Sequence, residues 1–322
     1  MHHEKPLVSV VIPLLNEEDV IDATLREVSQ VLDRVTEAYE IIVVDDGSED
    51  GTFAAVERAH QANSRIKGLK LSRRFGKEAA MLAGLAQTRG KAVVTMDGDL
   101  QHPPALIPVM IEKWREGAQI VHGVKQTRNY GGYFHRIASR LFNRLFSRVA
   151  GFSIANSSDF KLLDARVAQL LVQGFPEQQR FHRGLSSWVG FRQESVQFQV
   201  AERPAGQSQW GLYALVRYAW NAVTSYTSLP LQLVPVLGLV MLIASVVLGT
   251  EAVISRLNGN AISGFATLEI TILFSGSIIM IGLGIVGQYL ARVYDEVKKR
   301  PVFVVADELG FELPSQTDEG EA

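Results

Sequence analysis

Acidic residues follow three short apolar runs of this 322-residue chain. Glu17 comes after the first run, Asp46 after the second, and Asp97 and Asp99 after the third, separated by Gly98. Carboxylates gathered in one place repel one another unless a cation lies among them or their pKa values rise. Alternating aspartate oxygens are typical ligands of Mg²⁺ or Mn²⁺, ions that keep coordination positions open for phosphate oxygens. We therefore expect a divalent metal ion and a phosphate-bearing substrate.

Simpler alternatives exist for two of these assignments. A lone Asp-x-Asp pair is more often a solvated turn, and only its place directly after an apolar strand favours the metal here. The segment from Asp45 to Ser48 is also a good turn. Ser48 or Asp50 could cap a helix that begins at Thr52, and Asp46 can take part in a turn and in a ligand contact at once.

The elements that must position these residues alternate between strand and helix. Short β-branched runs predict strands at Val8–Pro13, Glu40–Asp45 and Lys91–Asp97, and helical patterns occupy Glu17–Leu32, Thr52–Ala62 and Lys77–Thr88. This order, with one more strand before the third helix, predicts an α/β fold with a doubly wound, mostly parallel sheet. Since such sheets bind ligands at the carboxyl ends of their strands, the three acidic clusters are expected at one edge.

Composition excludes several classes of function. The 32 Lys and Arg residues nearly balance 34 Asp and Glu residues, so no global positive field favours a nucleic acid as partner. There is no cysteine, which excludes disulfides, thiolate metal sites and a cysteine nucleophile. The length allows one large domain plus an appendage.

Two long uncharged runs predict a transmembrane hairpin. Tyr218 to Thr250 holds 33 residues without a charge and Ile270 to Ala291 holds 22, whereas a bilayer core requires about 20 helical residues. The alternative is two buried helices of a large soluble core, but neither run keeps the polar face of most soluble helices. Basic residues flank the pair while the connector has only Arg256, so both ends are expected in the cytoplasm. The N-terminal residues do not resemble a signal peptide.

A cationic stretch precedes the hairpin. Gly117 to Ser158 contains no acidic residue, and its basic residues are Lys125, Arg128, Arg136, Arg140, Arg144 and Arg148. The last four repeat every four residues, which predicts one basic stripe on a helix at an anionic membrane surface. A solvated charged face is the alternative. Trp210 to Tyr226, rich in aromatic residues, is a second candidate for an interfacial helix.

Seven segments in a fixed order carry a resemblance to a known family. They are Val11–Glu18, Val43–Thr52, Ser72–Ala80, Met96–Pro104, Ser158–Leu163, Arg180–Leu185 and the terminal hairpin. The chain resembles the family 2 glycosyltransferases of GT-A fold, specifically the polyprenyl-phosphate glycosyltransferases related to dolichol-phosphate mannose synthase and to bacterial bactoprenol glucosyl transferases.

The resemblance implies a domain for each part of the chain. Residues 1–200 would form the cytoplasmic GT-A domain, and 201–227 would form amphipathic juxtamembrane helices at the interface. Residues 228–292 would form the transmembrane hairpin, with spans at about 229–250 and 269–291, and 293–322 a cytoplasmic tail.

Three sets of site residues are expected. By the resemblance, together with the basic residues Lys125 and Arg128, the nucleotide sugar would be held by Pro13, Leu15, Glu17, Val44, Asp46, Asp97, Gly98, Lys125, Arg128, Arg203 and Gln209. The basic stretch predicts Arg136 and Arg140, with Ser208, for the lipid phosphate, and the resemblance implies Asp97, Asp99 and Gln101 for Mg²⁺ or Mn²⁺. Gln209 departs from the family, which usually has a lysine there, and a neutral amide cannot replace an ammonium as a phosphate counter-charge. The Q-x-x-R-W motif of processive synthases is missing, which indicates a single transfer.

Asp99 and Asp159 are the expected catalytic residues. Asp159 resembles the proposed base of the family, but a polyprenyl phosphate is already largely ionised at pH 7 and requires little help from a base. We therefore assign Asp159 equally to orientation of the acceptor or to positioning of a cation. The alternative is a helix N-cap ahead of Phe160 to Leu171.

These implications define the expected function. The chain would transfer a hexose, best glucose from UDP-glucose, to polyprenyl phosphate with inversion, in the cytoplasmic leaflet of an inner or plasma membrane. The alternatives are a dolichol-phosphate-mannose-type synthase that uses GDP-mannose, or a non-catalytic membrane scaffold that binds lipid-linked sugar. The expected partners are a nucleotide sugar, polyprenyl phosphate and membrane lipid, without nucleic acid.

The C-terminal segment from Arg300 to Ala306 reads as a short strand after the second span. Its pairing partner is not visible in the sequence. An exposed β-branched edge tends to recruit another chain. We therefore expect this tail to dock on a neighbouring subunit and to produce a homo-oligomer.

Overall fold

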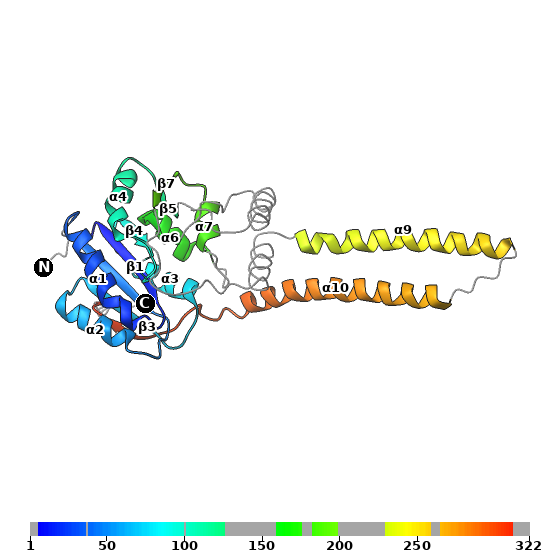
Figure 1. Ribbon diagram of the computed structural model, residues 1–322, viewed down its shortest axis with the longest axis horizontal. Helices are drawn as coiled ribbons and strands as arrows, with labels where there is room; N and C mark the ends of the chain where they lie inside the picture. Colours follow the sequence, from blue (N-terminus) through cyan, green and yellow to red (C-terminus); the bar gives the residue numbers. More distant parts are fainter. Residues whose placement is uncertain are drawn as a thin grey trace, which may run out of the picture. The chain divides into compact units, whose positions relative to one another are not determined.

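The computed structural model describes residues 6–36, 38–99, 101–125, 159–175, 182–198, 229–258 and 265–311. The chain divides into two compact units. The first contains a β-sheet with its covering helices, and the second contains two long helices (Figure 1).

The described part of the first unit holds one eight-stranded sheet in the order β7-β5-β6-β4-β1-β2-β3-β8. Its strands are β1 (Val8–Leu14), β2 (Tyr39–Asp45), β3 (Ile66–Leu71), β4 (Ala92–Thr95), β5 (Ile120–Lys125), β6 (Lys161–Asp164), β7 (Gln193–Phe198) and β8 (Val305–Leu309). Strands β4, β1, β2 and β3 run parallel to one another, β6 is antiparallel to both of its neighbours, and β8 is antiparallel to β3. The predicted mostly parallel α/β sheet is confirmed.

Helices cover both faces of this sheet (Figure 1). They are α1 (Glu18–Asp33), α2 (Thr52–Ala62), α3 (Lys77–Ala86), the short η1 (Pro104–Leu106), α4 (Ile107–Arg115), α6 (Ala165–Gln173) and α7 (His182–Trp188). Along β2, Ile41 and Val43 pack in the core formed with α1, α2 and α4, whereas Ile42 and Val44 pack on the opposite face with α3. Because both faces of the sheet are buried, the four successive residues Ile41 to Val44 are all apolar, which explains the β-branched runs of the sequence.

The edge strand β8 comes from the segment after the second long helix. It pairs with β3 of its own chain, with Gly68 opposite Leu309, and the backbone N–H of Ser72 donates to the carbonyl of Val304 at 2.9 Å. Phe303 and Phe311 pack against the core under α3. The expected strand at Arg300–Ala306 is therefore displaced toward the C-terminus. Its expected docking on a neighbouring subunit is wrong for this structure, because the edge of β3 is the partner.

The second unit contains α9 (Leu229–Leu257) and α10 (Phe265–Val297). Segments Val234–Ser255 and Phe274–Val297 are long and apolar enough to cross a membrane. Their apolar side chains are largely uncovered by protein, as in Ile243, which is 57% exposed. Both helices extend beyond the predicted spans because no helix-breaking residue ends them where the apolar run stops.

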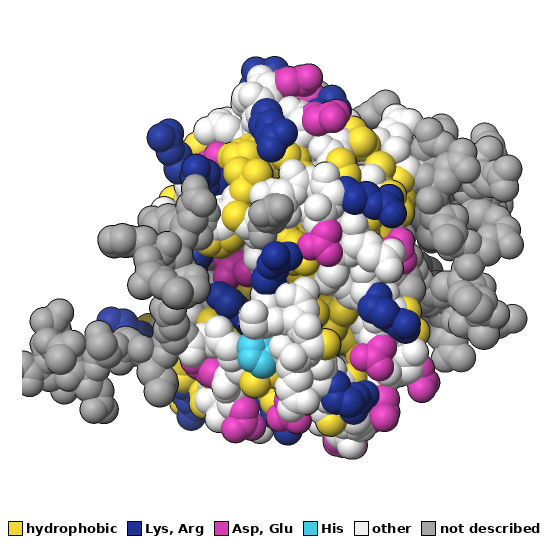
Figure 2. All heavy atoms as spheres, turned by 90° about the vertical axis from the view of Figure 1, so that its left-hand side faces the viewer, with side chains coloured by type: hydrophobic (Ala, Val, Ile, Leu, Met, Phe, Trp, Pro, Cys, Tyr) yellow, Lys and Arg dark blue, Asp and Glu magenta, His cyan; other side chains and the backbone are white. Residues whose placement is uncertain are grey.

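One face of the first unit carries mixed charge. In Figure 2, Lys and Arg side chains are interspersed with Asp and Glu side chains, and neither sign covers the visible face.

Candidate functional site

The loops after β1 and β2 are tied together by side chains that accept backbone hydrogen bonds. The N–H of Asn16 donates to Ser48 Oγ at 2.9 Å, and the N–H of Glu17 donates to Thr52 Oγ1 at 2.9 Å. Glu18 Oε2 accepts the N–H of Gly51 at 2.9 Å. These bonds fix the two loops relative to each other, so that their side chains present a preformed surface.

Asp50 and Asp46 both serve this framework. Asp50 accepts the N–H of Thr52 at 3.0 Å, and a hydrogen bond from the Thr52 hydroxyl lowers the pKa of Asp50. Asp46 is buried, and its carboxylate accepts the N–H groups of Phe75 at 2.7 Å and Gly76 at 2.8 Å. Asp46 thus holds the segment that leads into α3. This is a turn-type role of the kind that the sequence left open beside nucleotide binding.

Gly47 allows this approach. Its φ is +73°, and an added Cβ would lie 2.6 Å from the carbonyl carbon of Arg73 and 2.7 Å from the nitrogen of Arg74. A side chain at position 47 would therefore clash with the backbone of the segment before α3.

The loop after β4 carries the Asp-Gly-Asp motif. The N–H of Asp97 donates to Nδ1 of the buried His102 at 3.0 Å, which fixes that nitrogen as an acceptor. Asp99 Oδ1 accepts the N–H of Gln101 at 3.1 Å. A Cβ on Gly98 would lie 2.3 Å from Leu14 Cδ2, so the loop packs directly on the end of β1.

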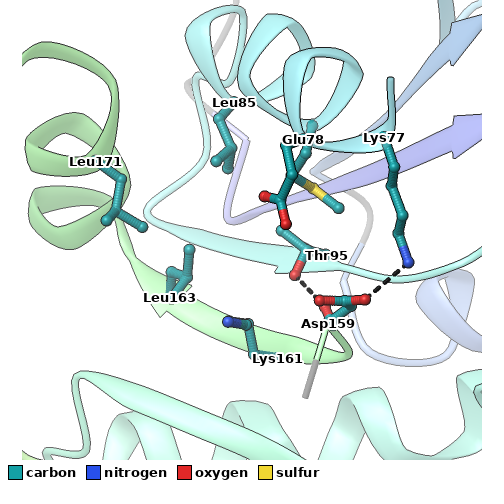
Figure 3. Close-up of a pocket in the computed structure, with 9 residues that line it drawn as sticks. Lys77, Glu78, Leu85, Thr95, Asp159, Lys161, Leu163 and Leu171 are labelled. Atoms are coloured by element: carbon teal, nitrogen blue, oxygen red, sulfur yellow. Dashed lines mark hydrogen bonds and ion pairs between the residues drawn. The ribbon is translucent and has the colours of Figure 1, made fainter. Parts of the chain in front are cut away.

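Asp159 lies two residues before β6, close to the loop after β4. Its carbonyl oxygen accepts a hydrogen bond from Thr95 Oγ1 at 2.6 Å, which ties it to the last residue of β4 (Figure 3). Asp159 is not a helix N-cap, so that alternative is wrong. The strand β6 intervenes, and Asp164 caps α6 by accepting the N–H of Arg166.

Lys77 joins the two aspartate regions. From the first turn of α3, its Nζ lies 2.8 Å from Asp159 Oδ2 (Figure 3). The same Nζ lies 2.5 Å from Asp97 Oδ1. The contact with Asp97 is an ion pair without the alignment of a hydrogen bond. Burial alone would lower the pKa of Lys77, but the charges of Asp97 and Asp159 outweigh burial and raise it. The side chain is therefore a cation at neutral pH.

A cleft of about 330 Å³ opens over these loops. That volume is in the range of ligand pockets. Its lining residues are Pro13, Leu14, Leu15, Glu17, Asp46, Arg74, Lys77, Asp97, Gly98 and Asp99. Lys77 also lines a second cavity beside it, together with Asp159 and the apolar side chains of Met81 and Leu85.

Most of the residues expected for the nucleotide sugar thus meet in one cleft. Val44 is an exception, because its side chain is buried in the core beneath α3. Lys125 ends β5, and its side chain is not among those described. Arg128, Arg136, Arg140, Arg203, Ser208 and Gln209 lie outside the described residues.

The aspartates suit a divalent metal ion in part. Asp97 Oδ1 is buried and has no hydrogen-bond donor in the described part of the chain, so it can accept a cation in place of Lys77. Within the described residues no three His, Cys, Asp or Glu side chains converge. A metal at Asp97 and Asp99 would take its other ligands from phosphate and water, which is the usual state of Mg²⁺. Gln101 lies next to Asp99.

Sequence reasoning missed two basic residues of the cleft lining, Arg74 and Lys77, and of these Lys77 contacts the aspartates. It lies in the Ser72–Ala80 segment that supports the family resemblance, yet no role was assigned to it. The available signal was a basic residue directly after Phe75-Gly76 at the start of a predicted helix. Lys77 and Asp159 are 82 positions apart in the sequence, so no local sequence pattern indicates their contact.

The fold and the aspartates at one sheet edge define a GT-A-like glycosyltransferase core. The chain belongs to glycosyl transferase family 2, whose profile matches residues 9–167. An uncharacterized glycosyltransferase of Synechocystis is 38% identical over 306 residues, which are 94% of this chain and 96% of that protein.

Two further relatives carry more specific names. A prophage bactoprenol glucosyl transferase homolog of Escherichia coli is 33% identical over 92% of this chain and 98% of its own. The bactoprenol glucosyl transferase of Shigella phage SfV is 33% identical over 94% and 98%. Among solved structures, a mannosyltransferase of Pyrobaculum calidifontis with GDP-Man and Mn²⁺ is 18% identical, with a TM-score of 0.48, over 87% of this chain and 88% of that one.

Proposed function

We propose that this glycosyltransferase moves a glucosyl group from UDP-glucose to a polyprenyl phosphate with inversion at the anomeric carbon. The observation that carries the proposal is the cleft at the sheet edge, which is lined by Asp97, Asp99 and Lys77, with Asp159 paired to Lys77 beside it. The names of the bactoprenol glucosyl transferase relatives support the choice of sugar and acceptor.

Each group at the edge has a part in this reaction. Mg²⁺ or Mn²⁺, held by Asp97 and Asp99 beside Gln101, would supply positive charge for the departing nucleoside diphosphate. Glu17 and Asp46 line the cleft where the nucleoside would lie. Asp159, held by Thr95 and Lys77, would orient the acceptor phosphate behind the anomeric carbon or position the cation that does so. The acceptor is itself ionised at pH 7, so attack does not depend on proton removal.

The apolar helices support a membrane location. The exposed apolar side chains of α9 and α10 would lie in lipid, and the positive-inside rule favours the cytoplasmic side for the first unit. From the sequence alone, Arg136, Arg140 and Ser208 are proposed for the lipid phosphate, and Arg203 and Gln209 for the donor phosphates. The same location agrees with a carrier lipid as acceptor.

A transfer assay tests the proposal. Membranes that contain the full chain would be incubated with undecaprenyl phosphate, Mn²⁺ and one radiolabelled donor at a time, UDP-glucose or GDP-mannose. We expect lipid-linked label from UDP-glucose, lost in Asp99→Asn and kept in Asp307→Asn, an exposed aspartate of β8. Label from GDP-mannose alone would support a mannose synthase instead. No label from either donor would contradict the proposed transfer reaction.

A further inference from the structure

Lys77 holds together the two acidic groups of the site. One oxygen of Asp97 and one of Asp159 share its ammonium group, at 2.5 Å and 2.8 Å. We propose that Lys77 is a positioning residue that occupies the metal position of Asp97 in the free enzyme, yields this oxygen to the metal and remains on Asp159. This inference rests on the proposed function in one respect, that Asp97 binds a metal ion.

No other described group competes for this role at Asp97. His102 Nδ1 is 3.8 Å from Asp97 Oδ2, but that nitrogen accepts the N–H of Asp97 and so carries no proton. Asp97 Oδ1 has no hydrogen-bond donor among the described residues. The negative charge of Asp97 is therefore balanced mainly by Lys77, and the oxygen that Lys77 approaches is the one a metal can take.

The backbone under Lys77 is rigid, whereas its side chain can move. Asp46 holds the N–H groups of Phe75 and Gly76, and Gly76 has a φ of +102° that a side chain would disfavour. Lys77 itself is 44% exposed and carries its charge on a flexible four-carbon stem. Because the backbone is fixed and the side chain is flexible, the ammonium group can leave Asp97 while it stays on Asp159.

The two cations exclude each other at one oxygen. A metal ion bound to Asp97 Oδ1 and an ammonium on the same atom would repel as like charges in a partly buried site. Loss of the Lys77 charge should therefore strengthen metal binding. Loss of the contact with Asp159 should at the same time weaken transfer, because Asp159 loses a partner that fixes its carboxylate. These opposite changes distinguish this role from a purely structural one, which would weaken both.

The experiment measures Mn²⁺ binding directly. The purified full chain in detergent would be titrated with Mn²⁺ and followed by electron paramagnetic resonance, with and without UDP. We expect Lys77→Gln and Lys77→Met to bind Mn²⁺ at least about tenfold more tightly than wild type, which corresponds to about 1.4 kcal/mol. Lys77→Arg, which keeps the charge, should bind nearly as wild type does. Two neutral substitutions keep the test valid if one of them does not fold.

A matched lysine provides the control. Lys113 Nζ forms an ion pair with Glu194 Oε2 at 2.7 Å, away from the cleft lining. Lys113→Gln should leave Mn²⁺ affinity and glucosyl transfer unchanged. At saturating Mn²⁺, Lys77→Gln should lower kcat for transfer at least tenfold, and Lys77→Arg should restore part of it.

The outcomes separate this inference from the proposed function. If wild type binds Mn²⁺ and the neutral Lys77 variants bind it equally or more weakly, the displacement of Lys77 by metal is contradicted, while the metal site stands. If wild type binds no Mn²⁺ with or without UDP, both the metal site and the inference that depends on it are contradicted. The transfer assay, which does not depend on Lys77 variants, decides the reaction separately.

Discussion

Two groups of carboxylates lie at the same sheet edge and differ in what balances their charge. The scaffold acids, Glu18, Asp46 and Asp50, accept hydrogen bonds from backbone N–H groups of neighbouring loops. Two working acids, Asp97 and Asp159, share one lysine ammonium. Backbone donors cannot leave without moving the chain, whereas a side-chain ammonium can. One sheet edge therefore holds acids that backbone donors fix in place and acids whose charge is balanced by a flexible side chain.

The largest expected effect comes from Asp99, which lines the cleft together with Asp97. Asp99→Asn should lower glucosyl transfer by about 100-fold or more, because an amide lacks the negative charge that a hard divalent ion requires and the metal contributes several kcal/mol to the transition state. The melting temperature should not change. Kinetics in membranes at saturating Mn²⁺ and thermal unfolding in detergent would measure both. Full activity of this variant after treatment with a chelator would refute the assignment.

The next effect concerns a buried histidine beside the working edge. Burial and, secondarily, the charge of Lys161 lower the pKa of His122 to about 4, against about 6.5 in an unfolded chain. The unfolded chain therefore binds more protons between these values, so the free energy of unfolding falls as pH drops from about 6.5 to about 4, by about 3 kcal/mol in total.

Urea unfolding of the full chain in detergent, repeated along this pH range, measures the effect. His122→Gln should flatten the loss of stability because glutamine does not titrate. Equal slopes in wild type and variant would show that other groups cause the acid dependence.

Substitution of a scaffold acid should lower stability, whereas substitution of Asp99 should lower activity alone. Asp46→Asn removes the charge from two hydrogen bonds to Phe75 and Gly76, and bonds to a charged group contribute about 1.5–3 kcal/mol. We expect a loss of about 2 kcal/mol in the free energy of unfolding and a lower yield of active protein. Asp307→Asn, in an exposed position, is the control and should unfold as wild type does. An unchanged stability would remove Asp46 from the scaffold group.

The smallest effect separates two roles of Asp159. If it orients the acceptor, Asp159→Asn should lower kcat by about tenfold. Between pH 6.5 and about 8.5 that loss should stay constant, because the acceptor has its second pKa near 6 and is already ionised. The measurement is kcat against pH for wild type and variant in the same membranes. A deficit that shrinks tenfold or more across this range would identify Asp159 as the base.

The sequence predicted those strands whose burial leaves a pattern in their own residues. Strands β1, β2 and β4 were recognisable because burial on both faces requires continuous apolar residues. The cleft residues after these strands followed from the rule for parallel sheets. Strand β8 was misplaced because its central residues, Ala306 to Glu308, are exposed and carry two acids, which is no strand pattern. The sequence allowed Asp159 to be interpreted as a helix N-cap because β6 has only four residues, too few to reveal the alternation of a strand.

The placement of β8 has a consequence for the order in which the chain is made. Gly68 and Leu309 pair although about 240 residues separate them, and both long apolar helices lie in between. At synthesis rates of about 5–20 residues per second, the edge of β3 waits tens of seconds for its partner. An open strand edge during this time can recruit foreign chains. Both long apolar helices must therefore be synthesised before β8 can pair with β3 and complete the sheet of the first unit.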